Sequence, residues 1–171
     1  MQATGLQSNL NTVISLGYDG IVLDLEEYVT GQTVTVDQWN TLFAAIKASG
    51  LLCIVTISHF SPYGMANGPQ LVASMLQNPN IDVLSPQLYT NGDEPQNEWT
   101  GYSDAWRTSV PIVAPSIVQA NYYDQLGSNS VTAYLPNAGG YFVWSNTPPT
   151  PPGPTPDCVR YVRPAKCIHR I

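Results

Sequence analysis

The chain has 171 residues, of which 43% are hydrophobic and only 11% are charged. This length is enough for one domain with a sizeable core, and the longest apolar run, LLCIV at 51–55, is far too short to cross a membrane. The formal net charge of −6 argues against a nucleic-acid partner, so a neutral polymer or a small molecule is the more natural ligand.

The end of the chain differs from the rest in both charge and composition. Four of the six Lys and Arg residues lie within the last dozen positions. Residues 147–157 form a Pro/Thr-rich segment that we interpret as an extended linker. The basic tail at 158–171 could begin a second module, and its two cysteines, Cys158 and Cys167, could pair, although spacing alone does not establish a disulfide. The main domain is therefore expected over residues 1–146.

Within this domain, helical and strand patterns alternate. Apolar residues recur at helical spacing in five segments, with Asp37 as the expected N-cap of the second. Gly17 and Gly50 are expected to end the first two helices. The predicted helices span 6–16, 36–48, 69–77, 100–109 and 121–128.

Short apolar and β-branched runs between these segments predict strands. Cys53 lies inside one such run and is expected to be a plain core residue. Alternating strands and helices predict an α/β protein with a parallel sheet, which fits both a doubly wound sheet and a (β/α)8 barrel. The predicted strands span 20–26, 51–58, 81–90, 110–116 and 139–145.

The first strand, GIVLDLE at 20–26, carries acids at its C-terminal end. Side chains alternate along a strand, so Val22, Asp24 and Glu26 share one face, with neighbours about 6.5–7 Å apart. Parallel α/β proteins bind their ligands at this end of their strands. Two half-buried carboxylates this close do not both ionise freely, so we expect one to keep its proton near neutral pH, as a general acid requires.

Two other interpretations of these acids remain open at this point. The acids could simply keep a strand end solvated. Alternatively, Asp19, Asp24 and Glu26 could hold a divalent cation, because hard cations prefer oxygen ligands.

The segment DGIVLDLE at 19–26 resembles the fourth-strand signature of glycoside hydrolase family 18, the chitinase family, which reads Asp-Gly-x-Asp-x-Asp-x-Glu. Asp19, Gly20, Asp24 and Glu26 match this pattern. Val22 stands where the family usually has a further Asp.

Two later segments resemble the same family in the same order. SPQLYT at 85–90 is similar to the sixth strand, through Gln87 and Tyr89, and GGYFVWS at 139–145 is similar to the last strand, through Trp144. The resemblance covers only strands four to eight of the family's (β/α)8 barrel. It therefore implies a partial TIM barrel of about five parallel strands.

The resemblance implies hydrolysis of β-1,4-linked N-acetylglucosamine polymers, with the substrate's own N-acetyl oxygen in place of a protein nucleophile. In that scheme Glu26 is the general acid and then the base, Asp24 stabilises the intermediate, and Tyr89 contacts the acetamido group. Asp19, Gln87 and Trp144 would bind substrate, with Trp144 stacking beneath a sugar ring.

Trp99 follows the 81–90 strand and could be a further sugar platform. We expect a secreted, extracellular monomer with a carbohydrate partner and no cofactor or metal, although the chain has no signal-peptide pattern. Because Val22 cannot share a proton with Asp24, activity is expected to be lower than with the full motif. The competing interpretation is a non-catalytic N-acetylglucosamine-binding protein or an inactive fragment.

Overall fold

The structure is a computed structural model of the whole chain, and it describes residue 5 and residues 8–26, 35–58, 66–92, 94–118 and 130–144. The predicted linker, the basic tail with its two cysteines and the helix predicted at 121–128 lie outside these residues. Among the helices that are described, none is long and apolar enough to span a membrane.

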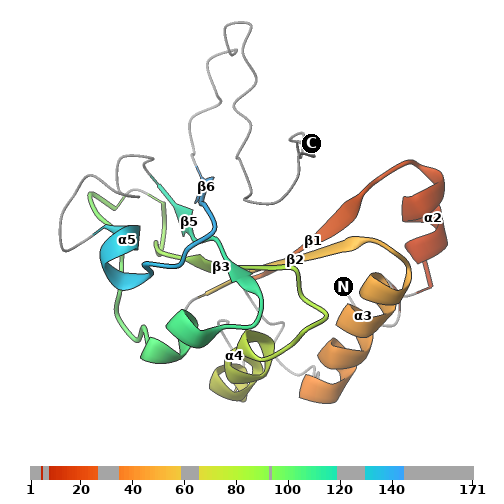
Figure 1. Cartoon of the computed structure of the whole chain (residues 1–171), viewed down its shortest axis with the longest axis horizontal. Helices are drawn as coiled ribbons and strands as arrows, with labels where there is room; N and C mark the ends of the chain where they lie inside the picture. The colour runs from red at the N-terminus through yellow and green to blue at the C-terminus, as the bar shows by residue number, and fades with distance from the viewer. Residues whose placement is uncertain are drawn as a thin grey trace, which may run out of the picture.

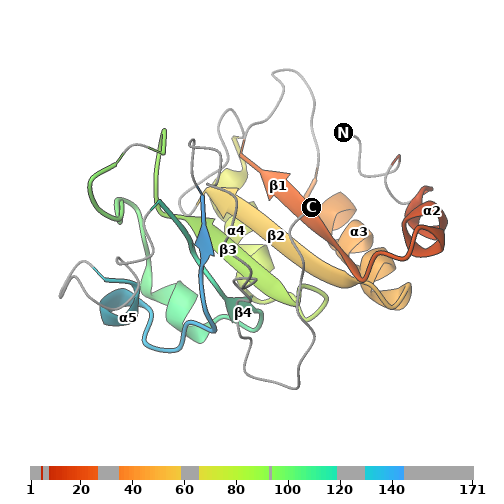
Figure 2. The same cartoon turned by 90° about the horizontal axis from the view of Figure 1, so that it is seen from above.

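Helices and strands alternate along the described residues, as predicted. All strand pairs are parallel, in the order β1-β2-β3-β5-β6, and β4 also pairs with β3. Helices α3 and α4 lie together on one face of this sheet (Figures 1 and 2). This half-barrel confirms the predicted partial TIM barrel. The elements are α2 (Leu10–Ser15), β1 (Gly20–Leu25), α3 (Val36–Ala48), β2 (Leu52–Ser58), α4 (Gly68–Leu76), β3 (Val83–Gln87), the 3-10 helix η1 (Asp104–Thr108), β4 (Ile112–Val113), β5 (Ser116–Ile117), α5 (Val131–Tyr134) and β6 (Phe142–Val143).

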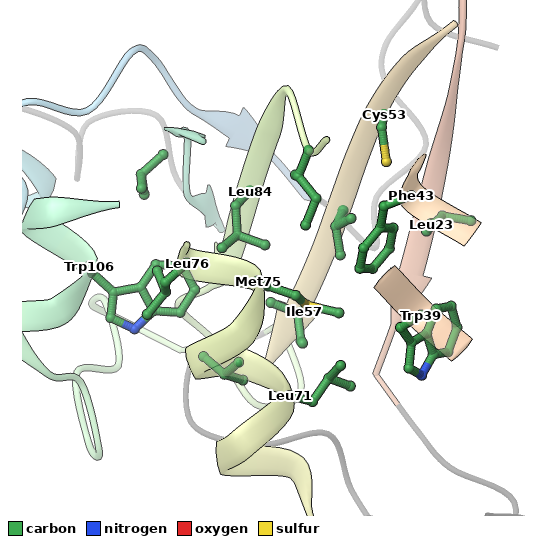
Figure 3. Packing of buried hydrophobic residues seen from close by; sticks show 14 of the residues in the cluster. Leu23, Trp39, Phe43, Cys53, Ile57, Leu71, Met75, Leu76, Leu84 and Trp106 are labelled. Atoms are coloured by element: carbon green, nitrogen blue, oxygen red, sulfur yellow. The ribbon is translucent and has the colours of Figure 1, made fainter. Parts of the chain in front are cut away.

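The main core lies between the sheet and its helices (Figure 3). Phe43 of α3, Ile57 of β2 and Met75 of α4 are all fully buried there. Cys53 is also fully buried, which confirms it as a core residue. Its burial, followed by the nearby charge of Asp82, raises the pKa of the thiol to about 12, so this thiol is unreactive at neutral pH.

Helix α3 has the predicted bounds but a different N-cap. Thr35, not Asp37, caps the helix: its hydroxyl accepts a hydrogen bond from the Gln38 backbone N–H at 3.2 Å. The Gln38 side chain accepts one in return from the Thr35 backbone N–H at 2.8 Å. This reciprocal capping box satisfies two backbone donors, which a cap at Asp37 would not do. Asp37 lies in the first turn, where its negative charge favours the helix dipole.

Several elements in the second half differ from the prediction. The strands predicted at 81–90 and 139–145 form only over Val83–Gln87 and, among the described residues, Phe142–Val143. Only 104–108 of the helix predicted at 100–109 forms, as a 3-10 turn. The strand predicted at 110–116 is divided into β4 and β5. The break lies where Pro86 of β3 faces this strand, because Pro86 has no N–H to donate across the ladder. The short helix α5, capped by the Ser130 hydroxyl, was not predicted, because four residues carry no helical period.

The sheet face away from α3 and α4 positions the site. Nearer the N-terminal ends of the strands, this face is apolar and holds a small cluster of Ile54, Val83 and Ala114, with Phe142 packed against it. The next layer, toward the C-terminal ends of the strands, is polar: Asp24 lies opposite Thr56 in the β1–β2 register. Gly20 at the start of β1 makes this pairing possible, because a Cβ there would lie 2.7 Å from the Leu52 Cβ.

Candidate active site

Asp24 and Glu26 both accept hydrogen bonds from the side-chain amide of Gln87. Gln87, only 7% exposed at the end of β3, donates from Nε2 to Glu26 Oε1 at 2.5 Å and to Asp24 Oδ1 at 3.3 Å. Thr56 of β2 also donates its hydroxyl to Asp24 Oδ1. Asp24 is exposed and Glu26 half-buried, so both carboxyls remain within reach of a ligand. Three adjacent strands therefore hold two carboxyls close together at one edge of the sheet.

Tyr89 and Trp144 lie beside this pair. Their rings stack with centroids 5.4 Å apart and planes at 28°. The Tyr89 hydroxyl lies 3.2 Å from the Ser116 hydroxyl of β5, and the Trp144 backbone N–H donates to the Ile117 carbonyl at 2.9 Å. Ser116 is also the register partner of Gln87, the residue that donates to both carboxyls, so the aromatic pair lies beside them. The structure thus brings Asp24, Glu26, Gln87, Tyr89 and Trp144 together.

The Tyr89 phenol is expected to stay protonated far into the alkaline range. Its pKa is raised to about 12: burial raises it most, the hydrogen bond with Ser116 lowers it, and the nearby charges of Glu26, Asp24 and Glu94 raise it. Its contribution to stability should be complete below the ordinary tyrosine pKa of about 10 and disappear as the pH rises toward the folded value.

A spectroscopic pH titration at 295 nm, comparing wild type with Tyr89→Phe, measures this directly. The difference between the two curves should show one phenol that ionises about two pH units later than an exposed tyrosine. Ionisation of this phenol near pH 10 would contradict the buried, acid-flanked position.

Asp19 does not join the group, so its predicted role in substrate binding has no support from this cluster. It precedes β1, at the opposite end of the strand, about 16 Å from Asp24 at the ordinary strand rise. The same position removes the alternative metal site, because Asp19 cannot share a cation with Asp24 and Glu26. Within the described residues, no cluster of three His, Cys, Asp or Glu side chains is arranged to hold a metal.

Trp99 belongs to a separate aromatic cluster. One face of its ring stacks on Tyr134 at 4.1 Å and 10°, and Tyr102 packs edge-on at 5.1 Å. Only its opposite face could therefore serve as a sugar platform. It lines a shallow hollow of about 510 Å³ with residues 94–100, and a second hollow of about 330 Å³ lies between η1 and the segment before β6. Neither hollow is lined by Asp24 or Glu26, which lie on the open face of the half-barrel.

Four residues of the site were missed by the sequence analysis: Thr56, Ser116, Gly92 and Glu94. Thr56 and Ser116 become relevant only through strand register, which a single sequence does not specify. Glu94 accepts three backbone hydrogen bonds from residues 90–92, and Gly92 lies against the Trp144 ring. The Asn-Gly pair at 91–92 is a turn signal that could have directed attention to this loop.

Comparisons with known proteins show a distant structural likeness. No protein-family model matches the chain, and no curated protein matches it. Among solved structures, a dihydrodipicolinate synthase from Agrobacterium tumefaciens strain C58 is similar, with a TM-score of 0.47 and 14% sequence identity. The match covers 82% of this chain and 43% of that chain, so this chain spans less than half the length of that protein.

Proposed function

We propose that this chain is a glycoside hydrolase acting on β-1,4-linked N-acetylglucosamine polymers. The observation that carries the proposal is the shared hydrogen bonding of Asp24 and Glu26 to Gln87, with Tyr89 and Trp144 stacked beside them. A carboxyl that can donate a proton, a second carboxylate to stabilise positive charge and an aromatic surface are the groups that glycoside cleavage needs. The resemblance of the three strand motifs to family 18 supports the same assignment.

The proposed reaction uses the substrate as its own nucleophile. Glu26 would protonate the glycosidic oxygen as the acetamido oxygen attacks the anomeric carbon, and the bond to the leaving sugar breaks with its electron pair on that oxygen. Asp24 would stabilise the positive charge that develops on the acetamido group. Glu26, now ionised, would then take a proton from the water that opens the intermediate. The anomeric configuration is retained.

The charge distribution favours a neutral substrate. Before residue 160 the chain has only two Lys or Arg residues, and both are paired: Lys47 with Asp82, and Arg107 with Asp104. The carboxylates of Asp24, Glu26 and Glu94 all act on Tyr89. An anionic glycan would meet repulsion there, whereas neutral N-acetylglucosamine units would not.

The second candidate is a protein that binds N-acetylglucosamine polymers without cleaving them. Val22 favours it, because this position lacks the acid that the family motif places behind Asp24. Both functions use the same surface, so only turnover separates them.

The test is hydrolysis of a chitohexaose substrate by the full chain, with cellohexaose as the matched control. Cellohexaose has the same linkage and length but no acetamido group, so a substrate-assisted enzyme should cleave only chitohexaose, with retained configuration in the product. Binding of chitohexaose without cleavage would establish the second candidate. Equal cleavage of both sugars would overturn the substrate-assisted mechanism.

A further inference from the structure

The loop after β3 forms a tight turn around one carboxylate. Glu94 accepts hydrogen bonds from the backbone N–H groups of Thr90, Asn91 and Gly92 at 2.6, 2.8 and 2.8 Å. Partial burial tends to raise the pKa of Glu94, but these hydrogen bonds outweigh it and lower the pKa below its usual value. Hydrogen bonds to an ionised acceptor are stronger than neutral ones, so the carboxylate fixes the path of this turn.

The turn brings the Gly92 backbone into contact with the Trp144 ring. Gly92 is buried and has φ +86°, a conformation that a residue with a side chain rarely adopts. A Cβ at this position would lie 1.9 Å from Trp144 Cζ3, so the indole ring occupies the space that any other residue would fill. The Trp144 ring is thus in contact with two parts of the same segment, Tyr89 at the end of β3 and Gly92 in the turn.

We propose that Glu94 is a positioning residue for Trp144: it shapes the turn whose Gly92 backbone, together with Tyr89, sets the orientation of the indole ring. The Gly92 N–H donates to Glu94 Oε2, whereas the Thr90 and Asn91 N–H groups both donate to Oε1. Without a second acceptor oxygen, the Gly92 N–H would turn toward water and Gly92 would leave the ring. Trp144 would then be held in place only by Tyr89 and its own backbone. The consequence for sugar binding rests on the proposed function, whereas the coupling between Glu94 and Trp144 does not.

The first experiment needs no sugar. The chain has four tryptophans, Trp39, Trp99, Trp106 and Trp144, so 5-fluorotryptophan labelling gives four ¹⁹F resonances, and Trp144→Phe assigns the fourth. Glu94→Gln should shift or broaden the Trp144 resonance and leave those of Trp39 and Trp106, buried at 8% and 2% exposure, unchanged. Those two resonances also show whether the variant is folded.

Glu98→Gln is the matched control in the same loop, because the Glu98 carboxylate accepts a hydrogen bond from the Thr100 N–H instead. It should leave the Trp144 resonance in place. A folded Glu94→Gln variant with an unmoved Trp144 resonance would overturn the proposal.

The second experiment is a double-mutant cycle on chitohexaose affinity. Glu94→Gln should weaken binding about fivefold to tenfold when Trp144 is present and less than about twofold in a Trp144→Phe background. Equal losses in both backgrounds would mean that Glu94 acts on the sugar independently of Trp144 and would overturn the positioning role. If no variant binds the sugar, the proposed function fails, while the ¹⁹F result still decides whether Glu94 positions Trp144.

Discussion

Replacing Glu26 with Gln is expected to lower kcat for chitohexaose by about a thousandfold and to change its affinity by less than about threefold. Glutamine has nearly the same shape as glutamate, and its side-chain oxygen can still accept the hydrogen bond that Gln87 now donates to Glu26 Oε1. The site should therefore keep its geometry. What the variant loses is the transferable proton, which matters only in the transition state and hence in kcat.

Steady-state kinetics and isothermal titration calorimetry on the two proteins measure kcat and affinity separately. Asp104→Asn is a suitable control, because Asp104 is highly exposed on η1 and its partner is Arg107. This control should retain wild-type turnover. If Glu26→Gln turns over as fast as wild type, Glu26 is not the general acid; if wild type and variant bind equally and neither cleaves, the chain is a binding protein.

The sequence predicts the elements of this fold better than it predicts their junctions. Helix α3 and strand β2 come out almost as expected, because a long apolar period or a continuous β-branched run leaves few alternatives. Helix α5 and the break between β4 and β5 were not predicted, since a four-residue helix and an interrupted ladder depend on tertiary neighbours. Local periodicity therefore indicates the half-barrel but not how its later strands meet.

In the candidate site, too, the local pattern predicts some residues, whereas others depend on tertiary neighbours. Asp24 and Glu26 follow from strand alternation alone, because two residues apart on one strand means one shared face. Their hydrogen-bond partners Thr56 and Gln87 lie on other strands, and only the register of β1, β2 and β3 brings them together. Asp19 shows the limit of a motif: the motif groups it with Asp24 in sequence, whereas strand rise carries the two to opposite ends of β1.

Replacing Val22 with Asp is expected to raise kcat by about tenfold. Val22 and Asp24 share a strand face, and Val22 is 59% exposed on it, so an aspartate there can be accommodated without burial of a new charge. Two acids this close would share a proton, which would allow Asp24 to accept and release one as charge develops on the substrate. In the present chain the Asp24 carboxylate has Thr56 and Gln87 as donors and Glu26 as an acidic neighbour on one side, but Val22 on the other side supplies no second acid.

Val22→Asn separates this proton sharing from polarity alone, because asparagine has the size and hydrogen-bonding capacity of aspartate but does not titrate. We expect chitohexaose turnover to rise in Val22→Asp and to stay at the wild-type level in Val22→Asn. Both variants should keep wild-type stability within about 0.5 kcal/mol, because the position is exposed, and urea denaturation checks this. Equal turnover in wild type and Val22→Asp would show that the missing acid does not limit catalysis. An equal rise in both variants would assign the effect to solvation of the strand face instead.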